Sequence, residues 1–214
     1  HGKAILKAGY SFVSCSDEVI ENGSVELQDY PFVDLILGKE KQTKMGRGAM
    51  ALEFKTFTPS MQQALTDYCQ KGGSLFISGA YVGSDLWDNP MANQTDKDFA
   101  TEVLKYKWRA GQAAIEGKVK SVTSPYSVLG IQYTYYNELN AESYVVESPD
   151  AIEPATNEAF TVLRYSENNL SAGIAYKGKY KTFVTGFPFE SLRSESERES
   201  LMKSVLDFFD SPTE

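Results

Sequence analysis

A turn that could carry a catalytic nucleophile lies near the middle of the chain, at Gly79-Ala80-Tyr81-Val82-Gly83. Its spacing is that of a nucleophile elbow, a sharp strand-to-helix turn that exposes its central side chain. The central residue here is Tyr81, and a phenol with an ordinary pKa near ~10 is a poor nucleophile unless it is strongly activated. The sequence therefore predicts the frame of an active site without the Ser or Cys of a hydrolytic elbow.

The sequence contains one histidine, which limits the catalytic mechanisms that the chain can use. Ser-His-Asp and Cys-His hydrolysis need an imidazole as general base, and zinc sites commonly use imidazole ligands. The imidazole belongs to His1, which we expect at a frayed end of the chain and away from the elbow. A His-dependent triad hydrolase is therefore not predicted, and neither a metal site nor a cofactor is predicted.

Carboxylates are a second source of catalytic groups, and the candidates are Asp17, Glu18, Asp34, Asp85, Asp88 and Glu190. Asp17 and Asp85 each follow a predicted strand, so both could meet at one sheet edge as general acid and base, or hold a cation there. The alternative is that both cap the helix and the turn that begin at these points.

Tyr81 and its neighbours also allow chemistry on sugars. A polysaccharide lyase needs a base and a cation beside the uronate carboxylate, and Tyr81 with an arginine such as Arg109, Arg47 or Arg193 could supply them. The alternative is a packed aromatic residue in an inactive elbow. Aromatic stacking and hydrogen bonds to hydroxyl groups would suit a sugar-binding site, for which the candidates are Tyr81, Ser84, Asp85, Trp87 and Asp88.

The elements around the elbow have the patterns of an α/β sheet. Leu75-Phe76-Ile77 is a continuous apolar run, typical of a strand covered on both faces. A helix over 59–71 begins at Thr58-Pro59 and places five residues on one apolar stripe, Met61, Ala64, Leu65, Tyr68 and Cys69. Strands at 10–15 and 32–38 alternate with short helices, which favours a parallel sheet with the elbow at its carboxyl edge.

The second half is richer in short strands, predicted at 113–122, 130–136, 160–165, 171–176 and 180–186. They indicate a β-rich, antiparallel insert over about 107–179, with a tight hairpin at Lys177-Gly178-Lys179. Capping boxes predict one helix from Thr95-x-x-Asp98 and a final helix from Ser194-x-x-Glu197.

Composition is that of an ordinary globular protein of one domain, with 214 residues and a net charge of −8. Nucleic acid is not an expected partner because clustered positive charge is lacking, and no apolar run is long enough to span a membrane. Cys15 and Cys69 are expected to be buried free thiols. Since the chain starts at His1, we expect a piece of a longer protein.

The order of elements resembles the class I glutamine amidotransferase-like group of flavodoxin-like folds. Segments 30–38 (YPFVDLILG), 72–85 (GGSLFISGAYVGSD) and 184–190 (VTGFPFE) are similar to parts of large secreted proteins of gut Bacteroidetes, labelled xanthan lyase or N-acetylmuramoyl-L-alanine amidase. The resemblance implies a three-layer α/β sandwich with a mostly parallel sheet. It also implies a secreted, periplasmic or cell-surface location, neighbouring domains in the same chain, and a ligand derived from polysaccharide or peptidoglycan.

The resemblance further implies a Cys at the elbow and a His in the closing strand-turn region. Those positions here look like Tyr81 and the turn over 186–189, and neither carries the required side chain. The first strand of the family's sheet would either lie upstream of His1 or be missing. We therefore expect a degenerate, non-catalytic domain that binds a ligand or supports its neighbours; the alternative is a carbohydrate lyase or hydrolase that uses carboxylates or Tyr81.

Overall fold

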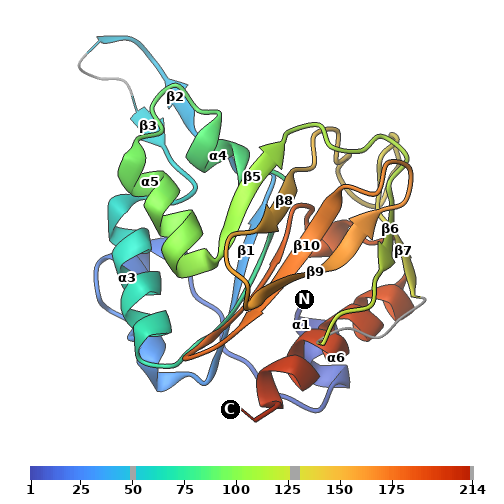
Figure 1. Cartoon of the computed structure of the whole chain (residues 1–214). Coiled ribbons are helices and arrows are strands. Elements are labelled where there is room, and N and C mark those ends of the chain that lie inside the picture. Colours follow the sequence, from blue (N-terminus) through green and yellow to red (C-terminus); the bar gives the residue numbers. More distant parts are fainter. Residues whose placement is uncertain (49–51, 126–130, 213–214) are drawn as a thin grey trace.

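One seven-stranded sheet organises the protein in the computed structural model, which describes residues 1–48, 52–125 and 131–212. Figure 1 shows this sheet, in the strand order β1-β4-β11-β10-β9-β6-β7. Its strands are β1 (Phe32–Gly38), β4 (Ser74–Gly79), β6 (Lys118–Ser121), β7 (Gln132–Thr134), β9 (Ala159–Tyr165), β10 (Ser171–Lys177) and β11 (Lys181–Thr185). Two ribbons pair β2 (Thr43–Met45) with β3 (Leu52–Phe54), and β5 (Tyr106–Ala110) with β8 (Ala151–Pro154).

Helices cover both faces of the sheet, with α3 and α5 on one side and α1 and α6 on the other (Figure 1). The α-helices are α1 (Gly2–Lys7), α2 (Asp17–Glu21), α3 (Pro59–Gln70), α4 (Ser84–Trp87), α5 (Gln94–Asp98) and α6 (Glu195–Asp210). Shorter turns are the 3-10 helices η1 (Leu27–Asp29) and η4 (Phe189–Ser191) and the π-helical turn η3 (Phe99–Leu104). No helix within the described ranges is long and apolar enough to cross a membrane.

Strand β4 contacts both hydrophobic cores of the protein, one on each face of the sheet. Leu75 and Ile77 pack into the core beneath α3, whereas Phe76 packs into the core beneath α6. All six residues of β4 are buried, which confirms the prediction of a strand covered on both faces. Its carboxyl end leads directly into the elbow.

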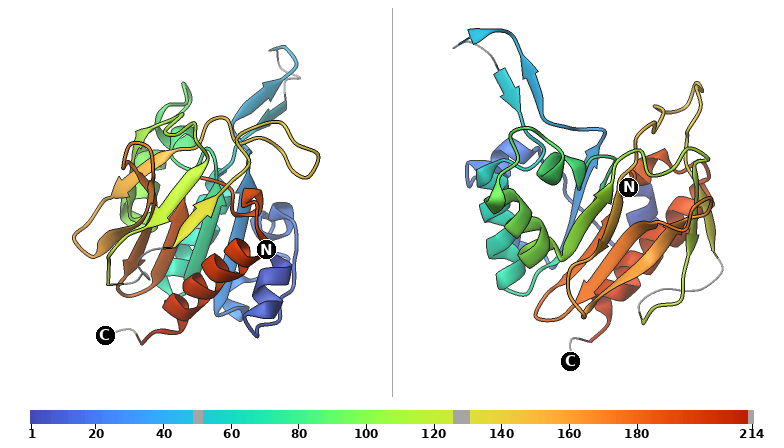
Figure 2. Two further views of the ribbon diagram at one scale, coloured as in Figure 1. Left: turned by 90° about the vertical axis from the view of Figure 1, so that its right-hand side faces the viewer. Right: turned by 45° about the horizontal axis from the view of Figure 1, so that its top comes forward.

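The expected flavodoxin-like sandwich with a mostly parallel sheet is wrong. Among the strands that the structure describes, the β1–β4 and β4–β11 pairs are parallel, while β11–β10, β10–β9, β9–β6 and β6–β7 are antiparallel. The antiparallel part curls into a half-barrel, so the protein has a mixed and mostly antiparallel sheet (Figure 2). The reason lies in the connections: the short turn at Gly178 reverses the chain between β10 and β11, and short reversals of this kind can only join antiparallel strands.

Local predictions failed where burial did not follow the sequence pattern. Residues 10–16 form no strand and are mostly exposed, so the expected strand at 10–15 is absent and Cys15 is an exposed free thiol. The β2–β3 and β5–β8 ribbons were not predicted. The expected start of a strand at Gly130 lies outside the described residues, and β7 begins at Gln132.

The two long helices follow their predicted stripes. In α3 the side chains of Met61, Leu65, Tyr68 and Cys69 are buried, and Thr58 accepts a hydrogen bond from the Met61 amide as its N-cap. In α6 the capping box of Ser194 and Glu197 is present. Its buried face contains Leu201, Met202, Val205, Leu206, Phe208 and Phe209.

The capping box of α5 lies two residues before its predicted position. It joins Asn93 and Asp96 instead of Thr95 and Asp98. The carboxylate of Asp96 also accepts hydrogen bonds from Lys55 Nζ at 2.6 Å and Gln62 Nε2 at 2.7 Å. Burial acts to raise the pKa of Asp96, but the hydrogen bond from Lys55 and those from Asn93 and Gln62 outweigh it and lower the pKa.

Replacing Asp96 by alanine should therefore lower the free energy of unfolding by roughly 2–4 kcal/mol, because the change leaves Lys55 and other buried donors without their acceptor. Urea denaturation at neutral pH would measure the loss. The matched control is Asp98→Ala on the same helix, which removes one exposed hydrogen bond with Gln94 and should change stability by about 0.5 kcal/mol or less. Equal effects of the two substitutions would contradict this account.

Candidate functional site

The elbow is present at the carboxyl end of β4, as the spacing predicted, and leads into α4. Its central side chain, Tyr81, is half-buried, with Lys41 Nζ 5.1 Å from the ring centroid. Burial raises the pKa of the Tyr81 phenol, and the negative charge of Glu147 raises it further. Tyr81 is therefore a neutral phenol at physiological pH, without the activation that a nucleophile or a base would need.

The backbone N–H groups at the end of the elbow already bind a carboxyl group of the same chain, the side chain of Asp150. One oxygen of this carboxylate accepts hydrogen bonds from the amide of Gly83 at 2.7 Å and the amide of Ser84 at 2.6 Å. The other oxygen accepts from Nε1 of Trp108 at 3.2 Å. Backbone N–H groups at the start of a helix can bind an anionic ligand, and in this protein the chain's own carboxyl group occupies those of Gly83 and Ser84.

Asp150 is fully buried, and its main chain is held as firmly as its side chain. Its N–H donates to the carbonyl of Gly186 at 2.8 Å, and its carbonyl accepts from the hydroxyl of Tyr165 at 2.7 Å. A Cβ atom at Gly186 would collide with the Asp150 carbonyl, so glycine is required for this close approach. Burial raises the pKa of Asp150 to about 7, and the hydrogen bonds from Ser84 and Gly83 limit the rise.

The predicted sugar-binding residues do not form one exposed surface. Asp85 is buried, and its Oδ1 accepts a hydrogen bond from the amide of Gln42 at 2.7 Å. Ser84 is bound through its amide to Asp150, and the half-buried ring of Trp87 packs near Tyr106, with centroids 6.3 Å apart. Asp88 is exposed beside them. Ser84, Asp85 and Trp87 therefore have structural contacts inside the protein.

Asp17 and Asp85 both lie near Glu40, although the strand that was expected before Asp17 is absent. Both lie close enough to Glu40 to affect its ionisation: partial burial raises the pKa of Glu40, and the charges of Asp17, Asp85 and Glu21 raise it further. Asp17 is exposed at the start of α2. Among the described residues no group of three His, Cys, Asp or Glu side chains has the arrangement of a metal site.

His1 is part of an ordered polar cluster, so the expectation of a frayed residue is wrong. Its Nδ1 lies 2.7 Å from Asp34 Oδ2, and its Nε2 lies 3.1 Å from Glu190 Oε2. The hydroxyl of Tyr144 donates to Glu190 Oε1 at 2.5 Å, and the ring of Phe189 packs 4.5 Å from the imidazole. This cluster joins the start of α1 to β1 and η4.

The charges in this cluster are those of an ion pair. Burial alone would lower the pKa of His1, but the hydrogen bonds and charges of Asp34 and Glu190 overcome it and raise the pKa to about 9. The pKa of Glu190 is lowered, since the hydrogen bonds from His1 and Tyr144 outweigh its burial. An imidazole that stays protonated at neutral pH cannot accept a proton as a general base.

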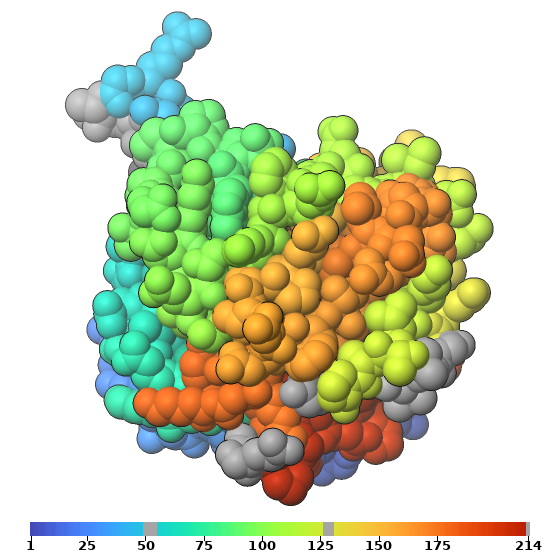
Figure 3. All heavy atoms as spheres, in the orientation of Figure 1, coloured from blue at the N-terminus to red at the C-terminus, as the bar shows by residue number. Residues whose placement is uncertain are grey.

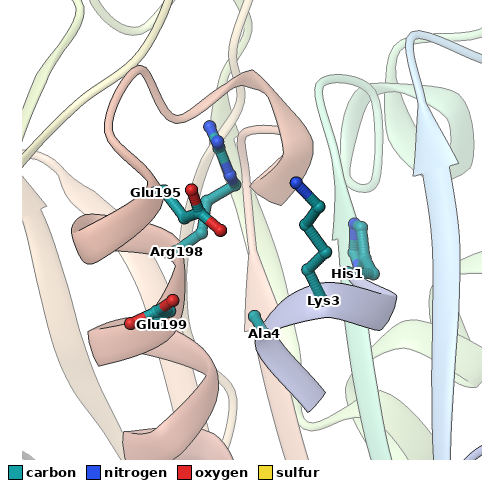
Figure 4. Close-up of a pocket in the computed structure, with 6 residues that line it drawn as sticks. All are labelled: His1, Lys3, Ala4, Glu195, Arg198 and Glu199. Atoms are coloured by element: carbon teal, nitrogen blue, oxygen red, sulfur yellow. The ribbon is translucent and has the colours of Figure 1, made fainter. Parts of the chain in front are cut away.

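A small pocket of about 130 Å³ opens beside His1, between α1 and the start of α6. Figure 4 shows Lys3 and His1 on one side and Glu195, Arg198 and Glu199 on the other. Its volume is below the roughly 300–1,000 Å³ of ordinary ligand sites. A second pocket, of about 390 Å³, is lined by Tyr30, Lys181 and other residues at the amino ends of β1 and β11, opposite the elbow.

Three residues with important contacts at the elbow, in the His1 cluster and near Asp17 and Asp85 were not identified from the sequence. They are Asp150, Tyr144 and Glu40. No local motif marks them, because each gains its partners from segments far away in the chain. His1 was set aside because of its place at the start of the sequence. Asp34 and Glu190 were among the candidate carboxylates, but their pairing through His1 depends on the folded chain.

Comparisons with known proteins identify the fold through solved structures. The chain is similar to part of the cold-adapted β-galactosidase from Rahnella sp. R3, with 12% identity and a TM-score of 0.60 over 98% of this chain and 26% of that chain. It is also similar to the N-terminal domain of mmIFT52, with 15% identity and a TM-score of 0.50 over 98% of this chain and 89% of that one. At these identities the likeness establishes the fold alone.

A third structure, the exo-β-1,4-mannosidase Op5Man5 from Opitutaceae bacterium strain TAV5, has 9% identity and a TM-score of 0.44 over 86% of this chain and 25% of that chain, and is too distant to bear on the fold. No protein-family model matches the sequence, and no curated protein matches it significantly. None of the three structures is described as an amidotransferase or a xanthan lyase, so that resemblance stays a prediction.

Proposed function

We infer that this chain is a non-catalytic domain of a carbohydrate-processing protein, with a structural role beside other domains. The observation that carries the inference is the Asp150 carboxylate on the N–H groups of Gly83 and Ser84. In a catalytic elbow the N–H of the residue after the nucleophile, here Val82, donates to the oxyanion. The adjoining N–H groups of Gly83 and Ser84 could bind an anionic group of a substrate, but both are occupied. Here they serve to join the elbow to the segment that enters β8.

Two further features of the site support a non-catalytic role. Tyr81 remains a neutral phenol beneath Lys41, and His1 is held as an imidazolium between Asp34 and Glu190. Neither residue has the protonation state of a nucleophile or a general base at neutral pH. The groups that could have done chemistry are engaged in contacts that stabilise the fold.

The carbohydrate part of the proposal is drawn from the likeness to a β-galactosidase, whose chain this fold matches over 26%. A match to a quarter of an enzyme suits a domain that accompanies a catalytic domain. The resemblance to amidotransferase-like domains of secreted Bacteroidetes proteins also favours a non-catalytic domain, because the elbow spacing is present but its nucleophile is not. In that setting the ligand or neighbour would be polysaccharide or cell-wall material.

An assay of the purified chain against neutral and uronate-bearing polysaccharides and muropeptides tests this proposal. Released reducing ends and unsaturated products would be followed together with the melting temperature. We expect no turnover on any substrate, and Tyr81→Phe should leave that result unchanged. Turnover that disappears in Tyr81→Phe would refute the non-catalytic role.

The carboxylates near Glu40 favour one alternative, a glycan hydrolase or lyase. A carboxyl group with a raised pKa is what a general acid requires, and Asp17 or Asp85 would then be the ionised partner. If the chain has this activity, Glu40→Gln should reduce kcat by roughly 100-fold or more, because a positioned acid contributes about that factor. Glu26→Gln, an exposed control, should retain full activity, and equal rates for both variants would exclude Glu40 as the acid.

A further inference from the structure

A pocket of about 390 Å³ lies at the amino end of the parallel strands, opposite the elbow. This volume is within the roughly 300–1,000 Å³ of ordinary ligand sites. The first residues of three neighbouring strands line it, Phe32 of β1, Ser74 of β4 and Lys181 of β11. Lys71, directly after α3, and Phe209, near the end of α6, also line it. The pocket is therefore built from the parallel strands and the two long helices.

Positive charge lines this pocket without an opposing carboxylate. Lys71 and Lys181 are in its wall, and none of the described residues that line it is Asp or Glu. Lys71 is exposed and forms no ion pair with the residues that the structure describes. Two more lysines, Lys177 and Lys179, lie at the β10–β11 turn, which is beside the end of α3 (Figure 1 and Figure 3). Because the whole chain has a net charge of −8, this local excess of lysines favours an anionic ligand.

The ammonium group of Lys181 is buried, and its hydrogen-bond partners are neutral. Its Nζ donates to the carbonyl of Phe209 at 2.6 Å and to that of Ser211, at the end of α6. An ammonium has three donors, and the third has no partner among the described residues. Burial and the positive charge of Lys177 lower the pKa of Lys181, whereas the negative charge of Asp210 acts in the opposite direction. A bound anion would therefore stabilise the charged form of Lys181.

Aromatic side chains give the pocket faces that suit a ring. Tyr30 and Phe32 are half-buried and line it together with the buried rings of Tyr68 and Phe209. The exposed amide of Gln28 and the hydroxyl of Tyr30 add polar groups, and neither is hydrogen-bonded to another side chain among the described residues. Ligand sites usually combine apolar faces with a few polar groups in this way. The pocket thus suits a ring that carries both hydroxyl groups and an anionic group.

We propose that this pocket binds an acidic oligosaccharide through the carboxylate of a uronic acid. The carboxylate would contact Lys71 and Lys181, and the sugar ring would lie against Tyr30 and Phe32. Hydrogen bonds from an ammonium to a carboxylate are roughly twice as strong as those between neutral groups. The anion site follows from the pocket alone, whereas the choice of a sugar ring rests on the proposed carbohydrate setting. The elbow takes no part in this binding.

Isothermal titration calorimetry with digalacturonate tests the proposal. The neutral galactose disaccharide with the same linkage is the matched probe, since it lacks only the carboxylates. We expect the acidic disaccharide to bind roughly tenfold or more tightly than the neutral one, because one charged hydrogen bond is worth about that factor. Its affinity should fall as salt is added. In NMR spectra the acidic probe should shift the amide resonances of residues 71–74 and of Lys181.

Substitution of the exposed lysine separates the pocket from the general charge of the protein. Lys71→Gln should weaken the binding of digalacturonate by roughly tenfold, because it removes a charged donor from the pocket. Lys203→Gln is the matched control, since it removes the same charge from an exposed site on α6 outside the pocket. This control should bind digalacturonate as the unmodified chain does.

The proposal is overturned if digalacturonate does not bind, if the neutral disaccharide binds equally well, or if the two lysine variants lose affinity equally. Resonance shifts confined to the elbow would also overturn it. Benzoate carries a carboxylate on a ring that is not a sugar, so equal affinity for benzoate would overturn the assignment to a sugar. The proposed function is tested separately by the turnover assay, and a failure to bind digalacturonate would leave the non-catalytic role intact.

Discussion

Replacing Asp150 by alanine should lower the free energy of unfolding by roughly 3–5 kcal/mol at pH 6. The reason is that three donors, the amides of Gly83 and Ser84 and the indole of Trp108, lose their acceptor inside the protein. Each unsatisfied buried donor costs about 1–3 kcal/mol, and relief from burying the carboxyl group offsets part of the sum. Urea denaturation with a fixed m-value would measure the change.

The control is Asp150→Asn, which keeps the shape and one acceptor oxygen but cannot ionise. The folded pKa of Asp150 is raised to about 7 from an ordinary value of 3.8, so the folded protein binds more protons than the unfolded chain between these values. The contribution of Asp150 to stability therefore falls as the pH rises from about 4 to about 7, and then stays constant. The advantage of the natural chain over Asp150→Asn should shrink across that range.

A constant difference in unfolding free energy between the natural chain and Asp150→Asn from pH 5 to pH 8 would contradict a raised pKa of Asp150. A small loss in Asp150→Ala would contradict the structural role of the carboxylate and leave the elbow N–H groups available to ligands. The Asp150 measurements therefore bear on function as well as on stability.

Replacing His1 by glutamine should lower the free energy of unfolding by roughly 2–3 kcal/mol at pH 6, because a pKa difference of one unit corresponds to about 1.4 kcal/mol. His1 is mostly buried, and its pKa is raised from 6.5 to about 9 by Asp34 and Glu190 against the effect of burial. Because the folded pKa is the higher one, this stabilisation is complete below about pH 6.5. It is lost as the pH rises through about 9.

Thermal unfolding of the unmodified chain and of His1→Gln from pH 6 to pH 10 would measure this loss of stability. The difference between the two proteins should be largest at pH 6 and small at pH 10. A proton NMR titration can follow the ring directly, since the sequence has one histidine. Lys203→Gln is the control: Lys203 forms an exposed pair with Asp207, and its loss should change stability by about 0.5 kcal/mol or less. A His1 titration near pH 6.5 would show that the ion pairs do not form in solution.

Both predictions place the strongest polar contacts at the carboxyl side of the parallel strands. Asp150 joins the elbow to β5 and to the end of β11, and His1 joins α1 to β1 and η4. In enzymes with this arrangement of parallel strands, that edge holds the reacting groups. Here the hydrogen bonds to Asp150 and the ion pairs of His1 stabilise this edge, which is why we favour a supporting role over catalysis.

The sequence by itself determined the elements whose signals are local. The N-cap at Thr58 with its apolar stripe, the capping box at Ser194, the buried run of β4 and the turn at Gly178 were each predicted correctly. These features depend on residues within one or two turns of each other, so periodicity and capping suffice to define them. The elbow and its missing nucleophile were evident for the same reason.

Only the tertiary structure decided the direction of the strands and the state of the site. An apolar run looks the same in a parallel strand and in an antiparallel one, so the strands after β4 could not be oriented from their own residues. The segment 10–16 has the alternation of a strand, yet no neighbouring strand pairs with it among the described residues. Asp150 lies 67 residues from Gly83, and His1 lies 189 residues from Glu190. Contacts at such separations arise when the sheet assembles, and they set the protonation states of Asp150 and His1.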